Sequence, residues 1–152
     1  MATVSTYLNF KSETEEAFNF YKSVFGGEFM GGIMRYGDMP SDEKSGPIPD
    51  DVKDLVMHMS MPILGGHMLM GSDAPEGFGF KFNPGNNVYI MLSPDSKEET
   101  TRLFKALSEG GTVEMDLADT FWGAHYGSCK DKFGVQWMFN FQYPNPEQQH
   151  QQ

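Results

Sequence analysis

The segments SETEEAFNFYKSVFGG at residues 12–27 and SKEETTRLFKALSEGG at residues 96–111 resemble each other at a separation of 84 positions. In each half of the chain a strand-like stretch precedes this segment. The segment itself has a helical pattern, and a Gly-Gly pair ends the helix. A repeat constrains the whole architecture, because both halves then take the same fold. The sequence therefore predicts an α+β chain of two βαβββ modules. The matched pairs are Leu8 with Leu92, Glu15 with Glu99, Phe20 with Phe104, and Gly26-Gly27 with Gly110-Gly111.

The first module is predicted to open with a strand at residues 4–10, because polar and apolar residues alternate there. Its helix is expected to begin after Ser12, since Ser12 and Glu15 have the spacing of a capping box. A strand at about 28–36 and a long exposed loop at 37–53 follow. Two strands, at 54–63 and 67–72, then form a hairpin around Gly65-Gly66. In the first strand Val4, Leu8 and Phe10 share one face, and Ser5, Tyr7 and Asn9 share the other.

The second module is predicted to contain a strand at 86–93, a helix at 97–107 and three further strands. These strands are expected at 112–117, around 123–129 and at 135–141. In the first strand Val88, Ile90 and Leu92 alternate with Tyr89, Met91 and Ser93. In the last strand Val135, Trp137, Phe139 and Phe141 form an apolar face, and Gln136, Met138 and Asn140 point the other way.

A length of 152 residues with 39% hydrophobic content suits one domain. We expect a single domain at residues 3–141, with modules at about 3–73 and 86–141. Residues 142–152 are expected to form a flexible tail, which includes His150. Cys129 is the only cysteine, so a disulfide within the chain is excluded. A small buried thiol is the favoured interpretation of this residue.

The formal net charge is -10, and such a charge repels nucleic acid and anionic membrane surfaces. No run approaches the roughly 18 apolar residues that span a bilayer. The N-terminal MATVSTYLNF has no basic segment followed by an apolar stretch of signal-peptide length. We therefore expect a cytoplasmic protein with no nucleic-acid or membrane partner.

Three segments together resemble the PhnB-like branch of the glyoxalase/bleomycin resistance/dihydroxybiphenyl dioxygenase superfamily, also called the vicinal oxygen chelate superfamily. The most specific is DTFWGAHYGSCKDKFGVQW at 119–137, and the others are YLNF at 7–10 and EEAFNFYKSVFGGEF at 15–29. The resemblance covers roughly residues 3–141. It implies paired βαβββ modules whose mixed sheets curl around a cleft, and a homodimer.

Metal-dependent members of this superfamily hold a divalent ion with four His or Glu side chains, on the first and last strand of each module. Carried over by strand position, these places fall on Ser5, Met70, Tyr89 and Met138. A hydroxyl, a phenol and two thioethers are poor ligands for Mn, Fe, Ni or Zn. We therefore expect no metal and no cofactor at the inherited site.

The histidines offer an alternative. His58 and His67 flank the predicted hairpin and could approach each other, and His125 follows TFWG. Such a relocated metal site would suit a lyase, dioxygenase or isomerase. Taken singly, His58 is a candidate for a general base, and no other catalytic residue is indicated.

The favoured hypothesis is a metal-free protein that binds an unidentified small molecule in an aromatic and methionine-lined cleft. A scaffold for dimerisation or regulation is a third possibility. Trp137 is expected in the core, whereas Trp122 could stack on a ligand or simply pack. Methyl transfer, an activity named for some relatives, is disfavoured, because EGFGF at 76–80 lacks the helix that follows a glycine-rich cofactor turn. The expected ligand contacts are Tyr7, Asn9, His58, Tyr89, Trp122, Tyr126 and Met138.

Overall fold

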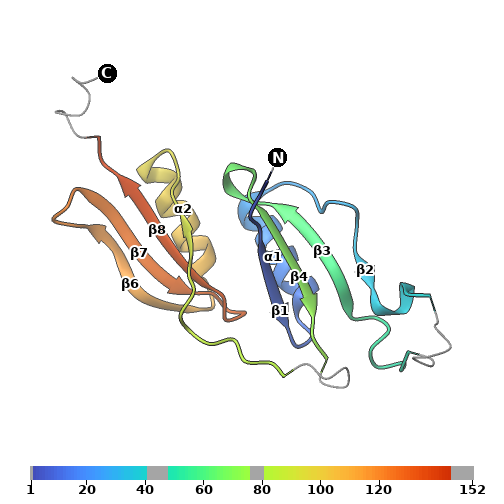
Figure 1. Cartoon of the computed structure of the whole chain (residues 1–152). Coiled ribbons are helices and arrows are strands. Elements are labelled where there is room, and N and C mark those ends of the chain that lie inside the picture. The colour runs from blue at the N-terminus through green and yellow to red at the C-terminus, as the bar shows by residue number, and fades with distance from the viewer. Residues whose placement is uncertain (1, 41–47, 76–80, 145–152) are drawn as a thin grey trace. The chain divides into compact units, whose positions relative to one another are not determined.

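The computed structural model describes residues 2–40, 48–75 and 81–144. The chain divides into two compact units, Met1–Asn83 and Pro84–Gln152. Each unit contains one four-stranded mixed sheet and one α-helix, in the order strand, helix, three strands (Figure 1). This confirms the predicted pair of βαβββ modules. Among the described residues, no helix combines the length and apolar character needed to cross a membrane.

The first unit contains β1 (Thr6–Phe10), α1 (Thr14–Phe25), β2 (Met34–Arg35), β3 (Val56–Pro62) and β4 (Met68–Asp73). Its strands lie in the order β1-β4-β3-β2. The β1–β4 pair is parallel, and β4–β3 and β3–β2 are antiparallel. β3 and β4 form the predicted hairpin, which turns at Leu64–Gly66.

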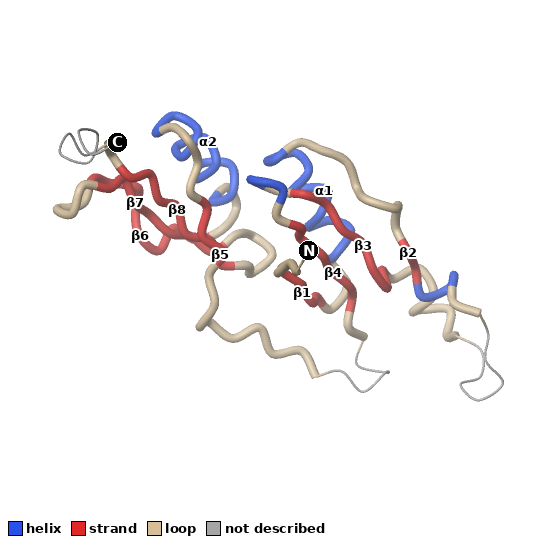
Figure 2. The backbone as a smooth tube through the Cα atoms, turned by 45° about the horizontal axis from the view of Figure 1, so that its top comes forward, coloured by secondary structure: helices blue, strands red, loops and turns tan. Residues whose placement is uncertain are grey.

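The core of the first unit lies between α1 and one face of the sheet (Figure 2). Gly71 on β4 permits close packing there, because a Cβ atom at this position would lie 2.7 Å from the Phe18 ring. Burying each large apolar side chain contributes roughly 1.5–3 kcal/mol. The helix supplies Ala17, Phe18, Tyr21 and Val24, and the strands supply Phe10, Met59, Met61 and Leu69, all buried.

The prediction of Ser12 as the N-cap of α1 is wrong. The helix begins at Thr14, and its N-cap residue Glu13 makes no side-chain cap bond. Instead, Oδ1 of buried Asp73 accepts hydrogen bonds from the Thr14 backbone N–H at 3.1 Å and from the Thr14 hydroxyl at 2.7 Å. A carboxylate at a helix N-terminus satisfies free N–H groups and favours the helix dipole. The cap therefore comes from β4, 59 residues along the chain.

Three predicted strands are shorter than expected. The strand expected at 28–36 is reduced to Met34–Arg35, since Gly31 and Gly32 have φ of 74° and 76°, outside the extended region. Val4 and Val88 lie before β1 and β5 and are exposed, at 85% and 69%. The loop expected at 37–53 begins with a 3-10 turn at Tyr36–Asp38, and its residues 41–47 lie outside the described ranges.

The second unit contains β5 (Ile90–Leu92), α2 (Lys97–Ser108), β6 (Thr112–Asp119), β7 (Ala124–Lys130) and β8 (Gln136–Gln142). Its strand order is β5-β8-β7-β6, with β5 parallel to β8. The predicted helix at 97–107 is confirmed. Ser96 is its N-cap and accepts a hydrogen bond from the Glu99 N–H at 3.1 Å.

Trp137 is fully buried, as predicted for a core residue. Its indole N–H donates to Oδ2 of Asp131 at 2.9 Å, and the other oxygen of Asp131 accepts from the N–H groups of Phe133 and Val135. The buried interpretation of Cys129 is confirmed too, and burial raises the pKa of its thiol to about 12. α2 adds Leu103, Phe104 and Leu107 to this core, with Phe104 edge-on to Phe139 at 5.2 Å.

Candidate functional site

The first sheet has a helix-free face, which is the face turned away from α1. Residues opposite each other on neighbouring strands share a face. The register places Tyr7 beside Met70 and Met70 beside Ser60, and it places Asn9 beside Ser72. Leu8 and Met59 flank Gly71 on the opposite face, where Gly71 meets the α1 side chains. The helix-free face therefore mixes phenol, amide, hydroxyl and thioether groups.

Three predicted ligand residues of the first unit meet on this face. The Tyr7 hydroxyl lies 3.3 Å from Nδ1 of His58, and their ring centroids are 5.7 Å apart. Beside them, the Ser72 hydroxyl donates to Oδ1 of Asn9 at 3.1 Å. These bonds link β1 to β3 and β4, so the side chains are held across the sheet. His58 thus presents an imidazole beside a phenol, an arrangement that can exchange hydrogen bonds with a polar ligand.

The second sheet has a corresponding helix-free face, turned away from α2. Met91, Met138 and Ser128 lie side by side across β5, β8 and β7. Tyr126 and Asn140 form the next row. The predicted residues Tyr126 and Met138 therefore share one face, and the exposed Met91 adds a second thioether to it.

Tyr89 precedes β5 and contacts Glu114, a residue that was not predicted as part of the site. Its hydroxyl lies 3.0 and 3.1 Å from the two carboxylate oxygens of Glu114 and donates to them. This hydrogen bond, followed by desolvation, raises the pKa of the Tyr89 phenol. β6 is exposed along nearly its whole length, so polar and apolar residues do not mark two distinct faces of this strand. The sequence of β6 therefore did not indicate that Glu114 belongs to the site.

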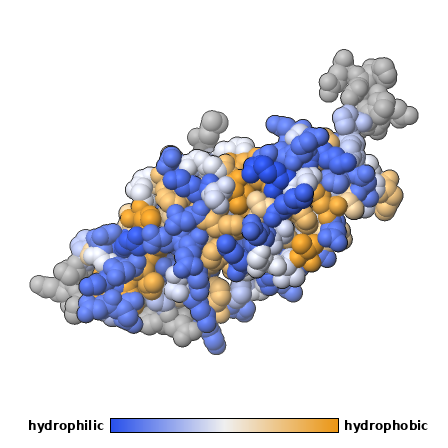
Figure 3. All heavy atoms as spheres, turned by 180° about the vertical axis from the view of Figure 1, so that it is seen from behind, coloured by the Kyte–Doolittle hydropathy of each residue, from blue (hydrophilic) through white to orange (hydrophobic). Residues whose placement is uncertain are grey.

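Trp122 lies in the turn between β6 and β7, and its side chain remains 55% exposed. Its ring meets Tyr126 edge-on, with centroids 6.3 Å apart. Phe121 lies 5.0 Å from the Trp122 ring in a T-shaped arrangement. Apolar groups also interrupt the hydrophilic surface in several places (Figure 3). Trp122 thus offers an accessible aromatic surface at the border of the helix-free face.

The four positions carried over from metal-dependent relatives do not fit a divalent ion. Ser5 is exposed and precedes β1, and Met70 and Met138 lie within their sheets. Tyr89 is already bonded to the Glu114 carboxylate. Thioethers and hydroxyls give such an ion neither charge nor basicity.

The histidines of the first unit do not come together as the sequence suggested. His58 contacts Tyr7, whereas Nε2 of His67 lies 2.9 Å from the Thr6 hydroxyl. Thr6 and Tyr7 are successive residues of β1, so their side chains point to opposite faces. Taking each unit by itself, the described residues include no group of three His, Cys, Asp or Glu side chains arranged to hold a metal ion.

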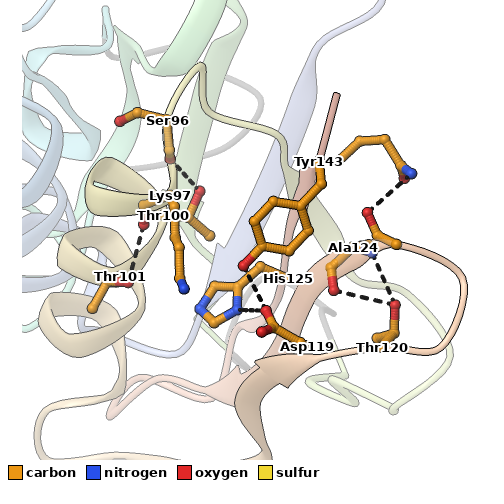
Figure 4. Close-up of polar contacts among 11 residues, drawn as sticks. Ser96, Lys97, Thr100, Thr101, Asp119, Thr120, Ala124, His125 and Tyr143 are labelled. Atoms are coloured by element: carbon orange, nitrogen blue, oxygen red, sulfur yellow. Dashed lines mark hydrogen bonds and ion pairs between the residues drawn. The ribbon is translucent and has the colours of Figure 1, made fainter. Parts of the chain in front are cut away.

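His125 lies in the second unit, in a network with Asp119 and Tyr143 (Figure 4). Nδ1 of His125 is 2.8 Å from Oδ1 of Asp119, and the Tyr143 hydroxyl donates to the same oxygen at 2.6 Å. The hydrogen bond from Tyr143, and then the one from His125, lowers the pKa of Asp119. Lys97 lies nearby, with its Nζ 5.8 Å from the centre of the Tyr143 ring. Asp119, Tyr143 and Lys97 were not predicted from the sequence, because β6, the residue after β8 and the start of α2 bring them together from separate segments.

Comparison with known proteins gives a family match over most of the chain. The model of the family described as 3-demethylubiquinone-9 3-methyltransferase matches residues 2–139. Protein YjdN from Escherichia coli K12 is 28% identical over 95% of this chain and 99% of its own length.

Solved structures agree with this match. Protein PA1353 from Pseudomonas aeruginosa is 36% identical with a TM-score of 0.80, covering 95% of this chain and 100% of its own. The PhnB protein from Bacillus cereus is 26% identical with a TM-score of 0.70, covering 92% and 99%. A glyoxalase/bleomycin resistance protein/dioxygenase family enzyme from Burkholderia phytofirmans is 17% identical with a TM-score of 0.59, covering 90% and 96%. At that identity the last similarity concerns the fold alone.

Proposed function

Because this chain belongs to the PhnB-like family described as 3-demethylubiquinone-9 3-methyltransferase, and has the glyoxalase/bleomycin-resistance fold, we propose that it is a metal-free small-molecule binding protein. The ligand is an aromatic compound that contacts the helix-free face of the second sheet. The observation that carries this proposal is the row of Met91, Met138 and Ser128 beside Tyr126, with exposed Trp122 at its border.

The chemistry of this face suits a flat, partly polar ligand. Thioether side chains are flexible and polarisable, so Met91 and Met138 can adapt to the shape of a ring system. Trp122 and Tyr126 can stack against such a ring edge or face. The Tyr89–Glu114 pair supplies a hydroxyl and a carboxylate that can accept hydrogen bonds from ligand donors. Quinones and aromatic drugs are therefore the first compounds to screen.

The helix-free face of the first sheet supports the same proposal with more polar groups. Tyr7, Asn9 and His58 lie within one sheet and are joined by hydrogen bonds to each other or to Ser72. In this proposal they select ligands by hydrogen bonding, whereas the second face contributes aromatic and thioether contacts. The contribution of each face to ligand affinity can be measured separately, because the residues of each face can be substituted without changing the other.

Methyl transfer is not the activity that we propose. Rossmann-type methyltransferases hold their adenosyl cofactor at a glycine-rich turn of a doubly wound parallel sheet. The two sheets described here are mixed, and each contains one parallel strand pair. The segment EGFGF at 76–80 lies outside the described residues.

The test is a thermal-shift screen of quinones and aromatic drugs, followed by isothermal titration calorimetry of each hit. Trp122→Ala should weaken binding of a hit by about 10-fold, because an aromatic contact contributes roughly 0.5–1.5 kcal/mol beyond its buried area. Met30→Ala is the matched control, since Met30 is an exposed apolar residue of the other unit. A set of hits whose affinity is the same in Trp122→Ala, Tyr126→Ala and Tyr7→Phe would contradict the proposal.

A further inference from the structure

The network around His125 lies on a different face from the proposed ligand site. Asp119 and His125 are paired across β6 and β7, and His125 and Phe141 are paired across β7 and β8. His125 is followed by Tyr126, which belongs to the helix-free face, so His125 faces the α2 side of the sheet. Tyr143 follows β8, and Lys97 is the first residue of α2. Four elements thus bring these side chains together (Figure 4).

The Asp119 contact fixes the tautomer of His125. A carboxylate only accepts hydrogen bonds, so Nδ1 of His125 carries the proton in the 2.8 Å bond to Asp119. Nε2 of the neutral ring then carries the lone pair. The hydroxyl of Tyr143, at 2.6 Å from the same carboxylate oxygen, holds Asp119 in place. Orientation of an imidazole by a carboxylate is what a general base requires.

His125 is largely buried, with a relative exposure of 9% for the whole residue. Nε2 forms no hydrogen bond within the described part of the chain. Every fully buried side-chain nitrogen and oxygen among the described residues has a hydrogen-bond partner. Nε2, which has no such partner, is therefore not completely buried.

Lys97 adds a positive charge to the same place. Its Nζ lies 5.8 Å from the centre of the Tyr143 ring, and Figure 4 shows the side chain running alongside His125 and Tyr143. A hydrogen bond with Tyr143, together with the charge of Asp119, raises the pKa of Lys97. The pKa of Asp119 is lowered by its bonds to Tyr143 and His125. At neutral pH both charges persist, so the Lys97 ammonium is held beside Tyr143 and Asp119, on the side of the network where Figure 4 also shows His125.

We propose that His125 and Lys97 form a hydrolytic site for small acyl esters, in addition to the ligand-binding function proposed above. Nε2 of His125 takes a proton from water as the water oxygen bonds to the ester carbonyl carbon. The carbonyl oxygen becomes negative beside the Lys97 ammonium, which lowers the cost of that charge. The ester C–O bond then breaks, and the imidazolium returns its proton to the leaving oxygen. One ester and one water give one acid and one alcohol.

In this mechanism His125 and Lys97 touch the reacting atoms, whereas Asp119 and Tyr143 are positioning residues. Asp119 holds the Nδ1–H tautomer and stabilises the imidazolium that forms during the reaction. Tyr143 keeps the carboxylate turned toward the ring. Loss of Asp119 should therefore change how the rate depends on pH, which a purely structural role would not do.

The test is hydrolysis of p-nitrophenyl acetate by the full chain, measured from pH 5 to 9. His125→Gln should lower the rate by about 100-fold, the lower end of what a general base contributes. Asp119→Asn should lower it by about 10-fold and move the pH midpoint of the rate. His67→Ala is the matched control, because His67 contacts Thr6 in the other unit, and it should retain the full rate. A His125→Gln rate equal to that of the unchanged protein overturns the proposal.

A second measurement needs no variant, so it remains decisive if a substitution disturbs folding. Diethylpyrocarbonate modifies accessible imidazole nitrogens, and mass spectrometry locates each modified histidine. Modification of His125 should proceed at the same rate as the loss of ester hydrolysis. If hydrolysis is lost while His125 is unmodified, or persists after its full modification, the proposal is wrong.

Discussion

Asp73 joins the last strand of the first unit to the first turn of α1 through two hydrogen bonds from Thr14, at 3.1 and 2.7 Å to one carboxylate oxygen. The other oxygen accepts from the Val56 N–H at 2.8 Å, and the Asp73 carbonyl accepts from the Tyr36 hydroxyl at 2.7 Å. One buried residue thus holds a helix, two strands and the 3-10 turn in one arrangement. The carboxylate is fully used by the fold, so we assign it no part in ligand chemistry.

Replacing this carboxylate should destabilise the chain strongly. In Asp73→Asn, one carboxylate oxygen becomes an amide N–H₂ that faces backbone or hydroxyl donors, so at least one buried donor loses its acceptor. We expect the free energy of unfolding to fall by about 2 kcal/mol or more. Urea denaturation followed by circular dichroism measures this change. Asp50→Asn, at an exposed site, is the control and should change stability by less than about 0.5 kcal/mol. Equal effects of the two substitutions would show that the Asp73 bonds contribute nothing.

The Tyr89–Glu114 contact predicts a pH effect. The neutral phenol donates to Glu114, so its pKa lies above the ordinary value of 10.0. A raised folded-state pKa contributes stability that is present below the unfolded pKa and is lost as the pH rises through the folded pKa. The relevant window therefore begins near pH 10 and extends upward. Glu114→Gln should move the pKa of Tyr89 back toward 10.0, as measured by carbon-13 NMR of labelled tyrosine. An unchanged titration of Tyr89 in this variant would mean that the contact is not formed in solution.

Cys129 should be inert in the folded protein. It is buried beside Trp137, its register partner, and burial raises the pKa of its thiol to about 12. Because the thiolate is the reactive form, Ellman's reagent at pH 8 should release almost no colour from the native chain. One equivalent should react after unfolding in guanidinium chloride, since the chain has one cysteine. Rapid reaction of the native thiol would place Cys129 at the surface instead.

The predicted homodimer can be tested at β6. This strand is at the edge of its sheet and is exposed along nearly its whole length, with Val113 and Met115 at 42% and 54%. Exposed edge strands with apolar side chains tend to be covered by another chain. We expect light scattering to give the mass of two 17.1 kDa chains. Met115→Lys should shift the population toward the monomer, whereas Lys105→Glu on α2 should not. A monomer for the unchanged chain would rule out this interface.

Much of the fold could be predicted because it depends on local patterns and on the repeat. The second helix begins at Lys97 as expected, and its N-cap is Ser96, which accepts from the Glu99 N–H. In the first helix, the prediction of a capping box from Ser12 and Glu15 was wrong. Asp73 supplies the cap there, and Glu15 is instead engaged by both terminal nitrogens of Arg35 at 3.0 Å. No local sequence pattern indicates that a distant carboxylate replaces a nearby hydroxyl.

The candidate sites were predictable only where alternation along a strand determines the face. Tyr7 and Asn9 were assigned correctly to one face of β1, and Met138 to one face of β8, because side chains alternate strictly. The partners of these residues were not predictable. Glu114 reaches Tyr89 across the sheet, and Asp119 meets Tyr143 from a strand 24 residues away. Such contacts depend on strand order and register, which could not be predicted from the local sequence pattern.

The most direct test of the proposed function uses the two tryptophans as a built-in probe. Trp137 is fully buried and Trp122 is 55% exposed, so a ligand on the helix-free face of the second sheet should quench mainly Trp122. The chain is first treated with EDTA and then titrated with a quinone hit from the screen. Our account predicts saturable quenching that EDTA does not alter and that Trp122→Phe abolishes. Quenching that appears only after a divalent metal ion is restored would contradict it.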